Sequence, residues 1–532
     1  MINVLVPDRK WFHTVHRFTT QTSYIYRKDT LHRPHATMDF LDPEKHRRHM
    51  ITIAIGYFFI ALAVGMATLI LLYYAYGFSF GKNGQVIQNG LMFVSSTPNP
   101  AKVYLNGKLN KAQTNSRVIL EEGEYEMQFQ RDGYRTWQRS VTIDGGKVVH
   151  YDYPFLIPTT LTTAAIKTYD ETPQLTMQSP DHRWVLVSRA STPEEFEEFD
   201  LKDPKAVTSD TLTLPAGLIT KATTTQSWQL VEWSSDNKHV LLKHVYDDTS
   251  EYVLLDRSAP DKSLNLSQTL DQNLTELRLV DHKYDRYYLY DAAKLALTKA
   301  SLGNPEPVPY LDHVLAFKSY GGDTVVYAAA AGADGDGSVR LKLQQGDTSY
   351  SLRDLTPGTS YLVDIAKFDG SLYVAAAAAS ENKAYIYQDP IAQINNRNIG
   401  LAVPVQVLRV TSPSYMAFST NSRFMMVEGG TSFGVYDAED EKGFSYSLPT
   451  ALDAPQTHAT WMDGHRLLYT SGGTLTMVDY DNSNRQKLTT NSPAYVPSFD
   501  SGFKYLFTFA PSKQDAAKTS LTSTSLRTAA DL

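Results

Sequence analysis

The sequence SPDHRWVLV at residues 179–187 places an acidic turn directly before an apolar strand. The same pattern returns as SDNKHVLL at residues 235–242, TNSRFM at residues 420–425 and MDGHRLL at residues 462–468. Eight copies can be aligned on Asp181, Asp236, Asp285, Asp323, Asp369, Asn421, Asp463 and Asp500, which lie 55, 49, 38, 46, 52, 42 and 37 residues apart. A period of about 40–50 residues with several short strands in each unit indicates a repeat array of small antiparallel sheets.

A further strand follows most copies of this turn, as at residues 252–256, 433–437 and 475–479. The spacing and strand content resemble the blades of a TolB-type or WD-like β-propeller. We expect this propeller to cover residues 159–528, with eight blades, or seven as the alternative. The final repeat is one strand short, so residues 161–169 are predicted to pair with strands from residues 498–528 and to close the ring.

Two alanine runs test this interpretation, because alanine favours helix on intrinsic propensity. Residues 328–331 and 375–379 directly continue apolar strands, and turn residues come next. We therefore predict that both runs are strands whose small side chains let adjacent blades approach closely.

Residues 88–158 predict a small antiparallel β-sandwich built from short strands and tight turns. Tyr125, Met127 and Phe129 alternate with polar residues, the period of a half-buried strand. Asn106-Gly107 follows an apolar run and is a strong hairpin signal.

Four motifs in this segment occur in a characteristic order: VSSTP at 94–98, AKVYLNG at 101–107, GEY at 123–125 and GYRTW at 133–137. Together they resemble a PEGA domain, although the name-giving Pro-Glu-Gly-Ala is replaced by PNPA at residues 98–101. The resemblance implies a non-catalytic, extracytoplasmic β-module of bacterial surface proteins, and it identifies no ligand.

The 22 residues at 51–72 carry no charge. As a helix they would span roughly 33 Å, which is enough for a hydrocarbon core of about 30 Å. We predict a transmembrane helix at residues 50–78, so that the lipid bilayer is one partner, with an aromatic belt at Tyr73, Tyr74, Tyr76, Phe78 and Phe80. A signal peptide cleaved near residues 75–77 is the alternative.

The charges beside this span predict its orientation. Lys45, Arg47 and Arg48 precede it, whereas only Lys82 follows closely. The positive-inside rule places residues 1–49 in the cytoplasm as a tail and everything after Phe80 outside, giving a single-pass protein of the cell membrane.

Two questions about the N-terminal region stay open: where translation starts and whether two copies of the helix associate. Translation could start at Met1 or at Met38, which begins a compact signal-anchor. The six tail histidines have no metal-like spacing and read as part of a solvated basic tail. Ala61 and Gly65 form a small-xxx-small pair through which two helices could approach, so the oligomeric state stays open.

Charge and cysteine content exclude several classes of protein. The net charge is −7; residues 1–50 carry nine Lys/Arg against five Asp/Glu, which leaves −11 for the rest of the chain. An acidic ectodomain argues against nucleic acid as a partner. The absence of cysteine excludes disulfides and thiolate chemistry, and fits a bacterial envelope protein that is stabilised by packing alone.

Several motifs resemble functional sites but lack the necessary context. GTSFG at residues 430–434 matches a nucleophile elbow, yet a strand follows where that elbow requires a helix, so we predict a hairpin turn. DGDG at residues 334–337 lacks the remaining ligands of a calcium loop and is predicted to be a solvated hairpin tip. Asp437, with the acidic residues 439–441, is predicted to form an exposed turn, and residues 194–198 an acidic insertion in the first blade.

These observations predict no catalytic, cofactor-binding or metal-binding residue and no enzyme. The leading hypothesis is a membrane-anchored, extracytoplasmic scaffold of the bacterial cell envelope that binds an envelope protein or cell-wall partner on the propeller face. The alternatives are a transmembrane sensor of an envelope ligand and a propeller-based hydrolase or lyase.

Overall fold

The computed structural model describes residues 43–75, 77–80, 86–270, 274–331, 337–397, 399–456 and 458–532. Most of the basic tail, with Met38, lies outside these residues, as do Lys82 and residues 334–336 of the predicted hairpin tip. The chain divides into two units, Met1–Tyr76 and Gly77–Leu532, which are described separately.

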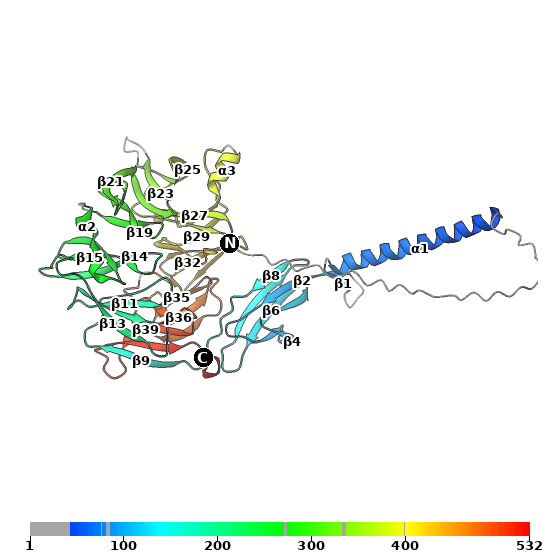
Figure 1. The fold of residues 1–532 in the computed structure, drawn as a ribbon, viewed down its shortest axis with the longest axis horizontal. Helices are drawn as coiled ribbons and strands as arrows, with labels where there is room; N and C mark the ends of the chain where they lie inside the picture. Colours follow the sequence, from blue (N-terminus) through cyan, green and yellow to red (C-terminus); the bar gives the residue numbers. More distant parts are fainter. Residues whose placement is uncertain are drawn as a thin grey trace, which may run out of the picture. The chain divides into compact units, whose positions relative to one another are not determined.

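The first unit contains α1 (Pro43–Ala75), drawn in blue in Figure 1. Its first turns carry the polar residues 44–49, and the stretch that follows, residues 51–72, is uncharged and has no polar face. Its segment His46–Ala75 is long and apolar enough to cross a membrane; the most apolar part of this segment has a mean hydropathy of 2.4 and is not buried. The hydroxyls of Thr52 and Thr68 donate to the carbonyls of Arg48 and Val64, so these polar groups are satisfied within the helix. The helix ends at Ala75, earlier than the predicted limit of residue 78.

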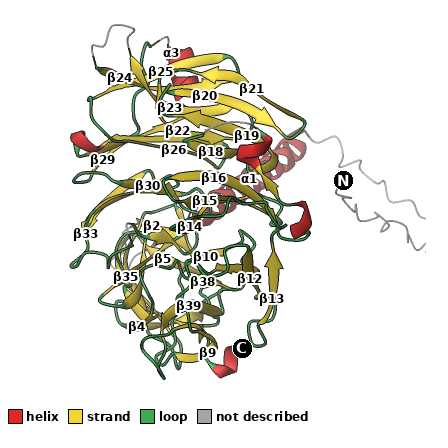
Figure 2. Ribbon diagram, turned by 90° about the vertical axis from the view of Figure 1, so that its left-hand side faces the viewer, coloured by secondary structure: helices red, strands yellow, loops and turns green. Residues whose placement is uncertain are grey.

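The second unit is mainly β, as predicted, and Figure 2 shows how completely strands dominate it. It begins with two four-stranded sheets that correspond to the predicted sandwich. One sheet holds β1 (Phe78–Phe80), β2 (Val86–Val94), β5 (Ser116–Glu121) and β8 (Val148–Tyr151). The other has the order β4 (Lys108–Gln113), β3 (Lys102–Leu105), β6 (Gly123–Gln130) and β7 (Trp137–Ile143).

The turn between β3 and β4 confirms the hairpin signal, because Asn106 and Gly107 both have positive φ, at 48° and 74°. The prediction that this sandwich is wholly antiparallel is wrong. β8 pairs with β2 in parallel, since the chain reaches it by crossing over from β7 in the other sheet rather than through a hairpin. Phe78, predicted to join a membrane belt, belongs to β1 and pairs with β2 opposite Gln88.

Within the described residues, eight more four-stranded antiparallel sheets follow, here numbered sheets 1 to 8. Sheets 1 to 4 are β10 (Leu175–Gln178), β11 (Trp184–Ser188), β12 (Glu195–Asp200) and β13 (Thr208–Thr213); β14 (Gln226–Trp233), β15 (His239–Tyr246), β16 (Thr249–Asp256) and β17 (Leu264–Asn265); β18 (Glu276–Val280), β19 (Lys283–Asp291), β20 (Ala296–Ser301) and β21 (Asn304–Leu311); and β22 (Val314–Tyr320), β23 (Thr324–Ala331), β24 (Ser338–Gln345) and β25 (Thr348–Leu355).

Sheets 5 to 8 are β26 (Tyr361–Phe368), β27 (Ser371–Ala378), β28 (Lys383–Gln388) and β29 (Gln406–Arg409); β30 (Tyr415–Phe418), β31 (Phe424–Gly429), β32 (Ser432–Asp437) and β33 (Lys442–Ser447); β34 (Thr460–Trp461), β35 (Arg466–Ser471), β36 (Thr474–Asp479) and β37 (Gln486–Thr490); and β38 (Ser498–Phe499), β39 (Tyr505–Pro511), β40 (Thr519–Ser525) and β9 (Thr162–Tyr169). Short helices lie in the connections: α2 (Leu266–Thr269), α3 (Pro390–Arg397), η2 (Pro260–Lys262), η3 (Ala379–Glu381) and η4 (Ala529–Asp531). Successive four-stranded sheets of this kind are the architecture of a β-propeller.

The repeated turn joins the first and second strands in seven of these sheets, and its chemistry explains why it recurs. The predicted copy at Asp285 is wrong, because Asp285 lies within β19 and the turn of sheet 3 is formed by residues 281–282. In sheet 6, the Ser419 hydroxyl accepts a hydrogen bond from the Phe424 amide at 3.0 Å, which closes the turn. Arg423 then bonds the carboxylate of Asp437 at the end of the third strand, at 2.7 and 2.8 Å. Arg183 and Asp200 make the same pair in sheet 1. The turn and the third strand are therefore locked together in both sheets.

The eighth sheet confirms the predicted pairing of residues 161–169 with the C-terminal strands. β9 pairs antiparallel with β40, from Thr162 opposite Ser525 to Tyr169 opposite Thr519. Figure 1 shows cyan β9 beside the red C-terminal strands. The side-chain amide of Gln178 in β10 both donates to and accepts from the backbone of Phe499 in β38, so sheets 1 and 8 contact each other.

Both alanine runs are strands, as predicted: β23 includes residues 328–331, and β27 ends with Ala375–Ala378 before η3 begins at Ala379. Ala375 and Ala376 are fully buried, in two different hydrophobic clusters on the two faces of the sheet. Tertiary packing therefore outweighs the helical propensity of alanine here.

Two predictions about acidic segments are wrong. Residues 195–198 are no insertion, since they form most of β12, in which Phe196 and Glu198 are buried. Asp437 is not part of an exposed turn, because its side chain is fully buried against Arg423. In both cases a tertiary ion pair permits burial of a carboxylate that the local sequence suggests is solvated.

Candidate functional site

The PEGA-like segment is joined to sheet 7 by buried polar contacts. The Trp137 indole donates to the Asp479 carboxylate at 3.0 Å. Arg139 forms an ion pair with Asp481 at 3.1 Å and donates to the Tyr480 hydroxyl at 2.8 Å. Burial raises the pKa of Asp479 to about 6, so this carboxyl depends on its few donors to remain ionised. These ionisable groups hold the two β-modules together.

A second set of contacts joins the segment to the C-terminus and to sheet 7. Tyr134 donates to Asp531 at 2.7 Å, and Arg131 also pairs with Asp531. The ring of Tyr153 stacks on that of His465, with centroids 4.5 Å apart. The buried side chains of the segment form one hydrophobic cluster with residues of sheets 6 and 7, so its core is continuous with theirs.

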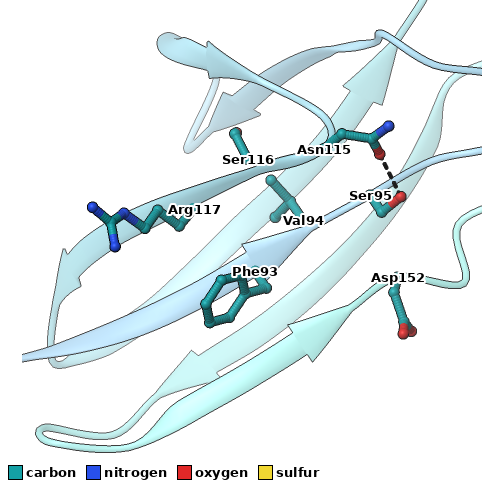
Figure 3. A pocket seen from close by; sticks show the side chains of 7 residues that line it. All are labelled: Phe93, Val94, Ser95, Asn115, Ser116, Arg117 and Asp152. Carbon is teal, nitrogen blue, oxygen red and sulfur yellow. Dashed lines mark hydrogen bonds between the residues drawn. The ribbon is translucent and has the colours of Figure 1, made fainter. Parts of the chain in front are cut away.

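A cavity of about 280 Å³ lies at the edge of the PEGA-like sheet formed by β2, β5 and β8, and we take this region as the candidate site. Figure 3 shows Phe93 on β2, with Arg117 on the neighbouring strand β5 and Asp152 just beyond the end of β8, and with Ser95 donating to Asn115 at 2.6 Å. The cavity has an aromatic floor and a polar rim.

The strand register places the side chains beside this cavity in rows across the sheet. Leu91 lies opposite Ile119 on one side and Val148 on the other. In the next row Phe93 lies between Arg117 and His150. The rings of Phe93 and His150 are stacked, with their centroids 5.0 Å apart. We call these six residues the outward face. The alternate positions of β2, such as Met92 and Val94, point into the core and are buried.

A second recess, of about 540 Å³, lies between sheets 5 and 6. It is lined by Tyr373 together with the carboxylates Asp369, Glu439 and Glu441, all near the repeated turns. The pKa of the Tyr373 hydroxyl is raised, mainly because the side chain is buried and secondarily because carboxylates lie nearby. The recess therefore has a negative potential that disfavours anions.

The segments that resemble catalytic motifs take structural roles. Gly430, with φ of 61°, lies in the turn between β31 and β32, and Ser432 begins β32 and accepts a hydrogen bond from the Thr411 amide. This confirms the predicted hairpin turn within a sheet. Among the side chains that the structure describes, no group of three or more His, Asp and Glu residues could hold a metal ion.

One sequence feature indicates the outward face but was not used in the predictions above. Residues 91–94 are Leu-Met-Phe-Val, four apolar residues in succession, whereas the strand containing Tyr125 alternates apolar and polar residues. A strand with one solvated face needs only alternate apolar residues. The unbroken run therefore indicated that the second face also carries apolar side chains.

Comparison with known proteins finds one family match within the β unit. The PEGA domain family matches residues 89–156. Solved structures resemble the later sheets weakly: the Dos1 propeller has a TM-score of 0.43 at 12% identity, covering 68% of this chain and 95% of its own. Hsv2 of Kluyveromyces lactis gives 0.36 at 12%, covering 60% and 99%. The Cps50 (Swd1) propeller domain of Myceliophteria thermophila gives 0.35 at 12%, covering 62% and 100%. Comparison with curated proteins finds no match. Residues 89–156 therefore match the PEGA domain family, and four-stranded antiparallel sheets make up the part of the β unit that follows them.

Proposed function

We propose that this chain is a membrane-anchored, extracytoplasmic scaffold of the bacterial cell envelope that binds its partners without catalysing a reaction. The observation that carries the proposal is that one chain contains both a helix with a long apolar stretch and a large β unit. A helix of this length with no polar face has no stable place in water, and a bilayer supplies the environment it needs. The lysine and arginine residues that precede the uncharged stretch of the helix support a cytoplasmic N-terminus.

In this proposal the chain has four parts: a cytoplasmic tail at residues 1–49, a transmembrane segment at residues 50–75, the PEGA domain at residues 88–158 and a propeller at residues 159–528. The eight sheets form a closed ring of eight blades. The pairing of β9 with β40 and the contact between Gln178 and Phe499 support closure, because they link the beginning of the array to its end.

The partner in this proposal is an envelope protein or cell-wall component that presents positive charge to the propeller. The recess formed by Asp369, Glu439 and Glu441 supports this choice, because opposite charge accelerates encounter and selects between partners. The loops around it lie on a rigid array of sheets, which is where binding residues usually occur.

A combined topology and crosslinking experiment tests the proposal. The full chain, with a C-terminal epitope, is expressed in a bacterium whose outer layers can be removed. We expect it to remain in the membrane after alkaline extraction, and added protease to digest the epitope without breaking the cells. Protection of the epitope, or release of the full chain by alkali, would contradict the proposal.

Partner binding is tested in the same cells with a photo-crosslinking amino acid at Asp369 or Glu439. Glu306, an exposed acidic residue on β21 away from the recess, is the matched control. We expect both recess positions to give the same adduct and Glu306 to give none. Identical adducts at all three positions would show that the recess has no specific partner.

A further inference from the structure

The outward face of the PEGA domain exposes more apolar surface than a solvated sheet normally does. Ile119 is 65% exposed, Val148 is 53% exposed and Phe93 is 38% exposed, although all three lie within strands. Leu91 completes the row between Ile119 and Val148. A contiguous apolar patch of this kind on a domain surface marks a site of contact with a partner or a membrane.

The chain itself limits how far this face can be from the end of α1. Phe78 follows Ala75 by three residues, which reach at most roughly 11 Å. Phe78 lies opposite Gln88 on β2, and Leu91 is three residues further along the same strand, about 10 Å. With about 5 Å for the step from β1 to β2, the chain keeps Leu91 within roughly 26 Å of the last residue of the helix.

We propose that the outward face rests on the lipid surface beside the anchor, with Ile119, Val148 and Phe93 at the boundary between headgroups and acyl chains. This inference rests on the proposed function, because it requires α1 to cross the bilayer. The composition of the face fits a lipid interface: the apolar row is followed by a row in which Arg117 and His150 flank the aromatic ring. A guanidinium beside apolar side chains can reach lipid phosphates while its neighbours enter the acyl region.

The size of the face favours lipid over a second protein. A stable interface between proteins buries about 800 Å² on each partner, from roughly 20–30 residues. The outward face has six residues, four of them apolar, in two rows. Attachment through α1 keeps the lipid surface at a high effective concentration, so that a weak contact suffices there.

The absence of cysteine from the chain allows a direct test in the full-length protein. Val148→Cys and Val308→Cys are each labelled with the polarity-sensitive fluorophore NBD and reconstituted in phosphatidylcholine vesicles containing phosphatidylglycerol. Val308 is the matched control, a valine in β21 of the propeller that is 54% exposed. Some vesicles carry a nitroxide in the upper acyl chain, at the depth of roughly 5–10 Å that interfacial side chains reach.

We expect the label at Val148 to show blue-shifted emission and to be quenched by the nitroxide lipid severalfold more than the label at Val308. Ile119→Asp in the same labelled chain should abolish the difference. Equal emission and quenching at the two positions would overturn the inference. Label-to-label quenching at Val148 that disappears on dilution in lipid would assign the face to a second copy of the chain, and would overturn it as well.

Flotation of the vesicles separates failure of this inference from failure of the proposed function. A chain that does not float with lipid has no membrane anchor, so both ideas are refuted. A chain that floats while the label at Val148 stays in water retains the anchor and refutes only contact of the PEGA domain with lipid.

Discussion

Glu428 makes the propeller less stable at neutral pH than it would be with an uncharged side chain. It lies in β31, is 1% exposed, and accepts a hydrogen bond from the Ala459 amide at 2.8 Å. Burial outweighs this bond and raises the pKa of the carboxyl from 4.5 to about 7. Replacing it as Glu428→Gln retains the acceptor oxygen and the shape but removes the charge.

The expected effect follows from the difference between the folded and unfolded pKa values. A shift of about 2.5 units corresponds to about 3 kcal/mol. Because the folded pKa is the higher one, the folded state keeps its proton where the unfolded state has lost it. The contribution of Glu428 to stability is therefore most favourable below pH 4.5 and becomes less favourable as the pH rises to 7. Glu428→Gln should match wild type near pH 4.5 and exceed it by up to about 3 kcal/mol at pH 8.

The matched control is Glu251→Gln, at a buried glutamate whose pKa is shifted in the opposite direction. Burial alone would raise the pKa of Glu251, but donors from His244, Thr220 and Asn265 outweigh burial and lower it. Its ionised form stabilises the fold above pH 4.5, and that stability is lost as the pH falls through the lowered pKa. Glu251→Gln should therefore be less stable than wild type at pH 7.

The assay is urea unfolding of the full chain in detergent, followed by tryptophan fluorescence between pH 4.5 and 8. The two variants should deviate from wild type in opposite directions at pH 8. If Glu428→Gln is less stable than wild type at pH 8, the buried carboxylate makes a net favourable interaction and the reasoning fails.

Three further predictions concern the anchor, the repeated turn and the joint. Leu62→Arg places a charge near the centre of the apolar helix, at a cost of roughly 2.5–3.5 kcal/mol on insertion scales, so the chain should no longer float with membranes. Arg423→Ala leaves the buried carboxylate of Asp437 unpaired and should lower the free energy of unfolding by roughly 3–5 kcal/mol. Arg183→Ala breaks a half-exposed pair with Asp200 and should lower it by about 1 kcal/mol or less in the same urea titration. Trp137→Phe removes a hydrogen-bond donor to buried Asp479 and should lower the free energy of unfolding by roughly 1.5–3 kcal/mol at pH 8. The loss should be smaller at pH 5, because the Asp479 carboxyl is then protonated in the folded state. An equal loss at both pH values would show that the substitution affects packing alone.

Local patterns predicted the elements of this fold well. Seven of the eight predicted copies of the repeated turn lie between the first two strands of a different four-stranded sheet, and Asn106-Gly107 forms the hairpin expected of it. The copy at Asp285 lies within β19 instead. These features are determined by neighbouring residues, through turn chemistry and alternating polarity, so they are visible in a short window of sequence. The alanine runs could be assigned only because apolar strand residues precede them.

The candidate site was much less predictable. The outward face combines β2, β5 and β8, whose order includes a parallel pair that no turn signal announces. The acidic recess likewise combines residues from two sheets that are distant in sequence. Side chains converge at such sites through sheet order and register, and these depend on contacts across the whole unit.

By itself the sequence determined the apolar helix, the PEGA-like motifs, the repeat period and the missing strand that β9 supplies. Only the tertiary structure decided which charges are buried, as with Asp437 beside Arg423, and that the PEGA domain shares a core with sheets 6 and 7. The physical reason is that periodicity and turn chemistry act between near neighbours in the chain. The burial of a charge depends instead on a partner and a packing surface supplied by distant segments.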